Sequence, residues 1–204
     1  MNTIRVDQRS VVPNKVVCIG RNYVAHIKEL GNEVPSEMVV FCKPNSAIGD
    51  SLHWEHGGEP LHYEGEIALL FEGGKFTAAG FGLDLTKRQL QSHLKEKGLP
   101  WERAKAFDGA ALFSDFRSLA NGPDTLALEL AVNGELRQSG DVSLMMYPPG
   151  VILRELEAFM TLQDGDIVMT GTPAGVGPVT AGDRFHGRIL ENGQLLAEGI
   201  WQAI

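Results

Sequence analysis

The chain has 204 residues and a formal net charge of −8, with 43% hydrophobic and 22% charged residues. These values are typical of one globular domain, which buries roughly 70% of the surface that its unfolded chain exposes. The acidic balance argues against a general nucleic-acid binder, which usually carries a basic patch, and against binding to an anionic membrane surface. An acidic protein can still bind an acidic substrate where a metal ion or local basic side chains reverse the sign of the charge.

Short apolar runs bounded by glycine, proline and asparagine predict strands along most of the chain. Apolar and polar residues alternate on both sides of Asn133-Gly134 and of Asn192-Gly193. An Asn-Gly pair between two such segments is a strong hairpin signal. A turn-rich connection is expected over residues 51–60. The other strands are expected at residues 15–20, 39–44, 61–71, 78–85 and 166–171.

Three short helices are expected between these strands, over residues 21–31, 86–97 and 150–160. The second has the clearest limits, because Thr86 and Gln89 have capping-box spacing and Gly98 stands where a helix would stop. No internal repeat, linker or low-complexity segment interrupts the pattern. The sequence therefore predicts a mixed, mostly β domain of the α+β class, connected mainly by hairpins.

The N-terminus and the cysteines bear on the compartment. The first residues contain Asp7 and lack the apolar segment of a secretory signal, and no apolar run is long enough to span a bilayer. Cys18 and Cys42 both lie among apolar neighbours, which favours buried, reduced thiols over a disulfide or a zinc site. We therefore expect a cytoplasmic enzyme or binding protein.

The stretch LHYEGEIALLF contains two glutamates separated by one residue within a predicted strand. Because side chains alternate between the faces of a strand, His62, Glu64 and Glu66 would point the same way, and that face becomes apolar by Leu70. Two carboxylates so close repel each other, and each resists leaving water. Either this face is solvated, which is the more frequent reason for a Glu-x-Glu pattern, or positive charge lies over it.

Asp84 supplies a third carboxylate at the end of another predicted strand. Three carboxylates without a cluster of Cys or His suit a hard cation such as Mg²⁺, with Mn²⁺ or Ca²⁺ as alternatives. Such a set leaves coordination positions for water and a chelating substrate. Spacing alone leaves a metal site and a solvated acidic face about equally open.

Three further features each allow a functional and an ordinary interpretation. His26 and Glu29 are either a surface pair on a helix or a dyad in which Glu29 orients His26 as the base for a water. Lys105 is an ordinary exposed lysine unless it faces the carboxylates, where it could hold an anionic substrate or a developing oxyanion. Residues 171–178, GTPAGVGP, lack the ending of a phosphate loop. They form either a structural turn or a tight loop that offers backbone N–H groups and the Thr172 hydroxyl to a carboxylate.

Together these segments resemble the fumarylacetoacetate hydrolase superfamily, in particular its short branch of acylpyruvate hydrolases and oxaloacetate-acting enzymes. The matching stretches, in the order of the family, are VVCIGRNYVAHIKELG, VVFCKP, HYEGEIALLF, GFGLDLTKRQLQ, KGLPWERAKAFDGA, VNGELRQSG and DGDIVMTGTPAGVGPV. We expect residues 15–204 to form the catalytic domain and residues 1–14 an N-terminal extension. The resemblance implies a mostly β roll or sandwich with a few short helices, usually a homodimer.

The resemblance also implies the residues of the site. The metal ligands, for Mg²⁺ or Mn²⁺, would be Glu64, Glu66 and Asp84; the catalytic residues would be Lys105 and, on a lid helix, His26 and Glu29; and the substrate-binding residues would be Arg21, Gln91, Gly171, Thr172 and Pro173. The chain departs from many relatives at Arg88-Gln89, where these have Arg-Asp, and its segment between Pro44 and Glu64 is short. The segment after the Gly-Gly turn at residues 73–74 is short as well, and these two short segments could reshape the mouth of the pocket.

The implied activity is hydrolysis of the C–C bond of acylpyruvates, such as fumarylpyruvate or acetylpyruvate, to pyruvate and a carboxylic acid. The metal would stabilise the enolate, His26 would activate water, and Lys105 would hold the developing charge. The alternative is decarboxylation or tautomerisation of oxaloacetate, or isomerisation of unsaturated 2-oxo diacids, at the same site. A third possibility is a non-enzymatic acidic β module with a structural metal or a binding surface. The expected partner is a small 2-oxo acid, with no nucleic acid and no membrane.

Overall fold

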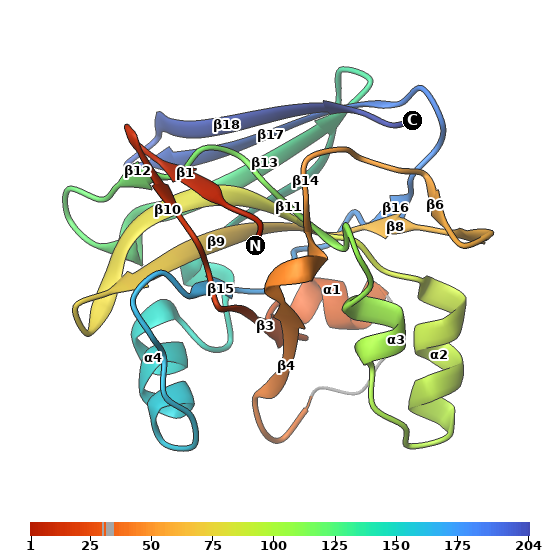
Figure 1. Ribbon diagram of the computed structural model, residues 1–204, viewed down its shortest axis with the longest axis horizontal. Helices are drawn as coiled ribbons and strands as arrows, with labels where there is room; N and C mark the ends of the chain where they lie inside the picture. Colours follow the sequence, from red (N-terminus) through yellow and green to blue (C-terminus); the bar gives the residue numbers. More distant parts are fainter. Residues whose placement is uncertain (30, 32–34) are drawn as a thin grey trace.

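The protein is described by a computed structural model that covers residues 1–29, 31 and 35–204. Two sheets dominate the described part, and Figure 1 shows the smaller lying across the larger. The larger sheet contains β3 (Lys15–Gly20), β4 (Val39–Pro44), β5 (Ile48–Gly49), β9 (Gly65–Glu72), β10 (Lys75–Asp84), β11 (Ala111–Phe113), β12 (Arg117–Ser118) and β15 (Ile167–Met169). The smaller sheet contains β13 (Leu126–Val132), β14 (Glu135–Asp141), β17 (Arg184–Glu191) and β18 (Gln194–Gln202).

The larger sheet has the order β4-β3-β15-β9-β10-β11-β5, with β12 paired to β10, and the smaller has the order β14-β13-β17-β18. Three two-stranded pairs complete the described strands: β1 (Ile4–Val6) with β2 (Arg9–Val11), β6 (Glu55–His56) with β7 (Glu59–Pro60), and β8 (His62–Tyr63) with β16 (Gly177–Pro178). The helices are α1 (Val24–Glu29), α2 (Arg88–Glu96), α3 (Glu102–Lys105) and α4 (Pro149–Glu157), with 3₁₀ turns at Asn45–Ala47, Pro123–Thr125 and Val142–Leu144.

The main core lies between the two sheets. Alternate residues of β13, Leu128 and Leu130 among them, are fully buried and belong to the same apolar cluster as Phe81 of β10. A Cβ at Gly187 on β17 would come within 2.3 Å of the Phe81 ring, so this glycine makes room for the ring between the sheets. Every second residue of β13 is apolar and buried in this cluster, so the alternation in the sequence produces a core between two layers.

The N-terminal hairpin packs onto the larger sheet. Ile4 and Val6 of β1 are buried in a second apolar cluster with Phe116, and the Asp7 N–H donates to the Phe116 carbonyl over 2.9 Å. The division at residue 15 stays a prediction. Cys18 is buried and Cys42 half-buried, and both are free thiols. Among the described residues, no helix is long and apolar enough to cross a membrane.

The predicted fold class and most elements are confirmed. Both Asn-Gly pairs join hairpins, and Asn133 and Asn192 adopt positive φ angles of 53° and 52°. The predicted helix at residues 21–31 begins later, at Val24, and Leu30 lies outside the described residues. The one-turn helix α3 was not predicted, because four residues are too few for a periodic signal.

Two other predictions are wrong in ways that concern the site. The second helix begins at Arg88 rather than with a capping box at Thr86, because Thr86 is held by a β-bridge to His62 and its hydroxyl accepts from Lys105. The predicted strand over residues 61–71 is interrupted at Glu64, since Tyr63 pairs with β16 while β9 pairs with β10 and β15. Tertiary hydrogen bonds outweigh the local signal in both places.

Candidate active site

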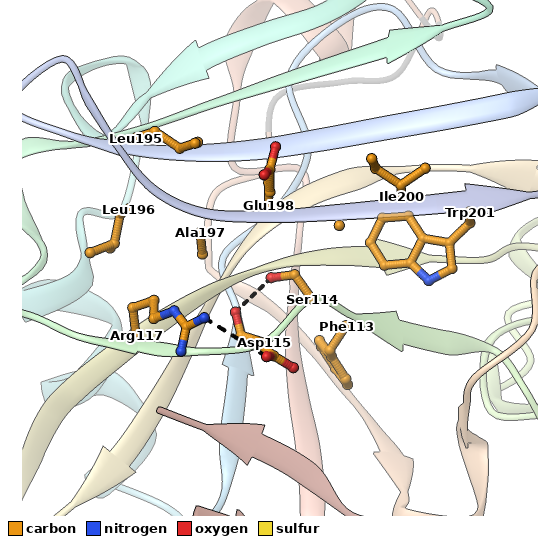
Figure 2. Close-up of a pocket in the computed structure, with 11 residues that line it drawn as sticks. Phe113, Ser114, Asp115, Arg117, Leu195, Leu196, Ala197, Glu198, Ile200 and Trp201 are labelled. Carbon is orange, nitrogen blue, oxygen red and sulfur yellow. Dashed lines mark hydrogen bonds and ion pairs between the residues drawn. The ribbon is translucent and has the colours of Figure 1, made fainter. Parts of the chain in front are cut away.

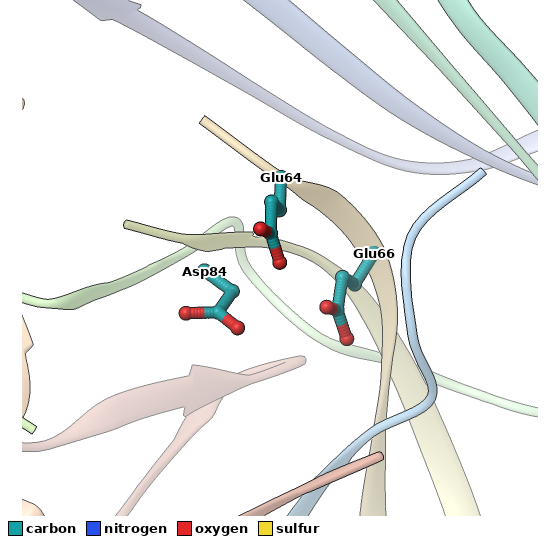
Figure 3. A group of neighbouring side chains, drawn as sticks. All are labelled: Glu64, Glu66 and Asp84. Carbon is teal, nitrogen blue, oxygen red and sulfur yellow. The ribbon is translucent and has the colours of Figure 1, made fainter. Parts of the chain in front are cut away.

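The three predicted metal ligands meet where two antiparallel strands begin and end. Gly82 of β10 lies opposite Glu66 of β9, and the Asp84 N–H donates to the Glu64 carbonyl over 2.8 Å. One carboxylate oxygen from each of Glu64, Glu66 and Asp84 lies within 4.8 Å of the others, and Figure 3 shows the three carboxylates gathered together. Their exposed fractions are 6%, 2% and 1%, so the solvated-face interpretation is wrong.

Positive charge lies over this buried face. The Lys105 Nζ, brought by α3, donates to Glu64 Oε2 over 2.9 Å, to Asp84 Oδ2 over 2.7 Å and to Thr86 Oγ1 over 2.6 Å. Arg88, the first residue of α2, donates from Nη2 to Glu64 Oε1. The lysine is therefore part of the carboxylate cluster, as the functional interpretation of Lys105 required.

A second buried lysine was missed by the sequence reasoning. Lys43 of β4 is fully buried, and its Nζ donates to the carbonyls of Lys105 and Ala110 and lies 2.8 Å from Asp84 Oδ1. The available signal was a lysine within the apolar segment VVFCKP, because a lysine in a buried strand needs a buried partner.

The electrostatics of the cluster set the protonation states. Burial opposes ionisation of Glu64, but the charges of Lys105 and Arg88 outweigh it and hold the pKa of Glu64 well below its usual range. Burial, reinforced by the charges of Asp84 and Glu64, raises the pKa of Glu66 well above its ordinary value. Burial alone would lower the pKa of Lys105, yet Asp84 and Glu64 outweigh it and raise that pKa, so this lysine stays an ammonium.

The residues fit a divalent cation. Asp84 Oδ1 is buried and accepts no hydrogen bond from the described residues, although the ammonium of Lys43 lies nearby. Glu66 is fixed by the N–H of Gly171, which donates to Oε2 over 2.7 Å. A set of three carboxylate oxygens, without a cysteine or histidine in the cluster, suits a hard cation such as Mg²⁺ or Mn²⁺.

The predicted dyad faces the same pocket. His26 of α1 is 5% exposed and lines the pocket with the carboxylates, and its Nδ1 lies 3.3 Å from Glu29 Oε2. Burial lowers the pKa of His26, although Glu64 and Glu29 oppose the shift, so the ring is neutral at neutral pH. Glu29 in turn accepts the N–H of Gly175 at 3.0 Å. The side chain that orients the histidine is therefore itself held by the loop at residues 171–178.

The loop is fixed by a glutamine that the sequence reasoning did not single out. Gln138 of β14 is buried; its Nε2 donates to Thr172 Oγ1 and to the Pro173 carbonyl, and its Oε1 accepts from the Gly65 N–H, each over 2.8 Å. Thr172 uses its single hydroxyl proton on the Gly65 carbonyl over 2.8 Å. Thr172 lines the pocket, whereas the Gly171 N–H is directed at Glu66. Substrate binding by these residues stays a prediction.

The pocket above the carboxylates is lined on one side by α2. Gln91 is 4% exposed, lines the pocket and accepts from Arg88 Nη1 over 2.9 Å. Arg21 also lines it, with a φ of 56° that is uncommon for a residue with a side chain and frequent at functional sites. Four basic and three acidic side chains are among the described residues that line this pocket: Arg21, Arg88, Lys95 and Lys105 with Glu64, Glu66 and Asp84.

Another hollow lies away from these residues, between β18 and the segment around β11 and β12 (Figure 2). It is wide and open, and its polar rim contains the ion pair of Arg117 with Asp115 at 3.9 Å. None of the predicted site residues lines it. Because the three buried carboxylates, Lys105 and His26 meet in the carboxylate pocket, we assign the chemistry there.

Comparison with known proteins bears on the family. A sequence model of the family described as fumarylacetoacetate (FAA) hydrolase C-terminal matches residues 15–200. The chain belongs to this family. It is 41% identical to oxaloacetate tautomerase YcgM of Escherichia coli (strain K12) over 191 residues, which cover 84% of this chain and 86% of that protein. The Arabidopsis thaliana protein named oxaloacetate tautomerase FAHD1, mitochondrial, is 40% identical over 191 residues and 84% of each chain.

A solved structure shares the whole fold. The fumarylpyruvate hydrolase of Pseudomonas aeruginosa, in complex with Mn²⁺ and pyruvate, superposes with a TM-score of 0.89 at 31% identity, over all of this chain and 95% of that one. The family is one of enzymes, so an enzyme is favoured over a non-enzymatic module. The curated relatives are named for the tautomerase alternative rather than for the hydrolase that the resemblance first suggested.

Proposed function

We propose that the chain is a metal-dependent oxaloacetate tautomerase, which interconverts the keto and enol forms of this 2-oxo dicarboxylate. The observation that carries the proposal is the buried cluster of Glu64, Glu66 and Asp84 with a lysine inside it and a neutral histidine facing the same pocket. The two tautomerases named above support the substrate. Proton transfer is the only chemistry that this reaction requires.

The charges of the pocket suit a dianion. Arg88 donates to Glu64 and Lys105 donates to Asp84. The Nζ of Lys43 lies 2.8 Å from the other carboxylate oxygen of Asp84. With a divalent cation added, the lining becomes strongly positive, which favours a substrate with two carboxylates. Oxaloacetate has two, whereas acetylpyruvate has one.

Each of the chain's own residues has a task in this reaction. A bound Mg²⁺ or Mn²⁺, held by Glu64, Glu66 and Asp84, would supply Lewis-acid stabilisation of the enolate. Neutral His26, oriented by Glu29, removes a proton from C3, so that the C–H electron pair forms the C2=C3 double bond and the keto oxygen becomes negative. The Lys105 ammonium, inside the cluster, stabilises that charge. A proton from His26 then reaches the oxygen and completes the enol.

The test is the exchange of the C3 protons of oxaloacetate for deuterium in D₂O, followed by NMR with Mg²⁺ and again with excess EDTA. Protein with Mg²⁺ should exceed the protein-free rate, and EDTA should remove the excess. Glu66→Gln should remove it as well, while Glu96→Gln, at an exposed position on α2, should not. His26→Asn should slow the exchange by about 10²- to 10⁴-fold, and the exposed His93→Asn should leave it unchanged. Wild-type protein that does not accelerate exchange would refute the proposal.

Hydrolysis of acylpyruvates is a second candidate, favoured by the His26–Glu29 pair and by the fumarylpyruvate hydrolase neighbour. The same dyad that removes a proton from carbon could remove one from water. Incubation with acetylpyruvate and Mg²⁺ separates the two functions, because hydrolysis yields acetate and pyruvate in equal amounts. Release of pyruvate and carbon dioxide from oxaloacetate would instead identify a decarboxylase.

Oligomeric state and location complete the proposal. We propose a homodimer, on the family resemblance, and light scattering of the purified chain tests it. We also propose a cytoplasmic location, although the Arabidopsis relative is named as mitochondrial. Fractionation of the source cells tests the location.

A further inference from the structure

One basic side chain of the pocket has no part in the mechanism above. Lys95 lies on α2 seven residues after Arg88 and four after Gln91, and this spacing places the three on one face of the helix. All three line the pocket that contains the carboxylates. Lys95 is half-buried there, in the last turn of a helix whose first turn holds Arg88 against Glu64.

The position of the Lys95 ammonium is fixed by an aromatic wall. Its Nζ lies 5.0 Å from the centroid of the Trp101 ring, and that ring in turn contacts Phe41, with centroids 5.9 Å apart. A cation over the face of a tryptophan is held electrostatically without being neutralised. Trp101 and Phe41 also line the pocket, so the ammonium is presented to the cavity rather than to bulk water.

Lys95 differs from the other lysine of the pocket in its partners. Lys105 is bonded to two carboxylates, whereas Lys95 forms no ion pair among the residues that the structure describes. Burial, together with the charges of Arg21 and Arg88, lowers the pKa of Lys95 to about 8. Lys95 is thus a half-buried cation near other cations and forms no ion pair with a carboxylate of the described residues. An anionic ligand would stabilise its charge.

We propose that Lys95 binds the distal carboxylate of the substrate and so selects 2-oxo dicarboxylates over 2-oxo acids with an uncharged tail. The proposal rests on the proposed function for the identity of the substrate. It adds the residue that binds the carboxylate farthest from the 2-oxo group. In this arrangement the 2-oxo acid end of the substrate binds at the carboxylate cluster, and its distal carboxylate binds to Lys95 beside Trp101. Lys95 is a specificity residue and takes no part in the proton transfer.

The test uses ligands that do not react, so its result does not depend on turnover. Malate and 2-hydroxybutyrate share a 2-hydroxy acid head and chain length, and only malate has a distal carboxylate. Calorimetry with saturating Mg²⁺ gives the dissociation constant of each for wild type, Lys95→Met, Lys95→Arg and Lys97→Met. Lys97 is the matched control, because it follows the same helix and is exposed.

Wild type should prefer malate. Lys95→Met should weaken malate binding by about 10- to 100-fold, the effect of losing one charged contact in a partly buried site, and should abolish the preference. It should leave the dissociation constant of 2-hydroxybutyrate within about twofold of wild type, since this ligand has no distal carboxylate to contact Lys95. Lys95→Arg should restore most of the preference, and Lys97→Met should behave as wild type.

Two results would overturn the proposal: equal weakening of both ligands in Lys95→Met, or wild type that does not prefer malate. Thermal unfolding of each variant in the absence of ligand excludes a folding defect as the cause. If wild type fails to accelerate deuterium exchange but Lys95→Met still loses malate selectively, the tautomerase proposal fails and the role of Lys95 stands. If exchange is accelerated and selectivity is unaffected, the reverse holds.

Discussion

The buried lysine on β4 allows the sharpest prediction about stability. Lys43→Met keeps the length of the side chain and removes its charge and its donors. The residue is fully buried, its Nζ serves the carbonyls of Lys105 and Ala110, and it lies 2.8 Å from a carboxylate oxygen of Asp84. The substitution removes one of the two lysines that contact Asp84, since Lys105 remains, and it leaves the buried Lys105 carbonyl without this donor.

The magnitude follows from these contacts. Breaking a buried ion pair by removing one partner costs about 3–5 kcal/mol. The Lys105 carbonyl, left without this donor, adds about 1–3 kcal/mol, whereas the Ala110 carbonyl keeps the N–H of Leu85. Relaxation of the site makes these contributions less than additive. We expect the free energy of unfolding to fall by about 4 kcal/mol or more, which is a large part of the total of about 5–15 kcal/mol for a domain.

The assay is equilibrium unfolding in urea with EDTA present. Lys75→Met, at an exposed position beside the β9–β10 turn, is the control and should change the free energy of unfolding by less than about 0.5 kcal/mol. In an Asp84→Asn background, Lys43→Met should lower the free energy of unfolding by at least about 1 kcal/mol less than in wild type, because the carboxylate that loses a cation is no longer present. A loss below about 1 kcal/mol in the wild-type background would refute the reasoning, since this is the range of an exposed ion pair.

Three further predictions concern the dyad and the loop. In the proposed mechanism the active form of His26 is neutral. Because burial lowers its pKa, the rate of exchange should fall only below pH about 6.5. Glu29→Gln removes a charge that raises this pKa and should move the fall to still lower pH, so a shift to higher pH would contradict the proposed roles. Gly175→Ala should cost about 2 kcal/mol or more and reduce activity, since its Cβ would meet a backbone carbonyl at 1.8 Å, while Gly182→Ala, also at positive φ but with open space, should cost less and keep activity. Thr172→Val should lower the free energy of unfolding by about 1–2 kcal/mol, because the hydroxyl donates to the Gly65 carbonyl and accepts from Gln138. A tenfold rise in KM would support the predicted contact with substrate, and a KM within about twofold of wild type would contradict it.

The sequence predicted the site where its signal was local. Glu64 and Glu66 are recognisable because the two-residue period of a strand puts them on one face, and the Asn-Gly hairpins because their turn requires positive φ. The end of another predicted strand added Asp84 as the third carboxylate, and the resemblance added the order of the motifs. These features are set by neighbouring residues, so a single chain reveals them.

The missed residues depend on contacts between distant parts of the chain. Gln138 accepts from Gly65, 73 positions away, and Lys43 donates to Ala110, 67 positions away. Nothing local marks Gln138 as belonging to the site, and the apolar segment around Lys43 indicates that this lysine needs a buried partner without indicating which one. Thr86 shows the converse, since a valid helix-start pattern is overridden by a strand bridge and a buried lysine.

The loop at residues 171–178 joins the two halves of the site. Its first N–H holds Glu66 in the carboxylate cluster, and the N–H of Gly175 holds Glu29 behind the histidine. Gln138 pins the intervening residues to the start of β9. A displacement of this loop therefore moves Glu66, a proposed metal ligand, together with Glu29, the carboxylate beside the proposed base. Glycine is required at both positions because Gly171 and Gly175 adopt positive φ angles, and because a Cβ at Gly175 would lie 1.8 Å from a carbonyl of β14. In the proposed mechanism, main-chain groups of the loop thus fix the positions of Glu66 and Glu29, and a change in the loop backbone should alter metal affinity and acid–base behaviour in parallel.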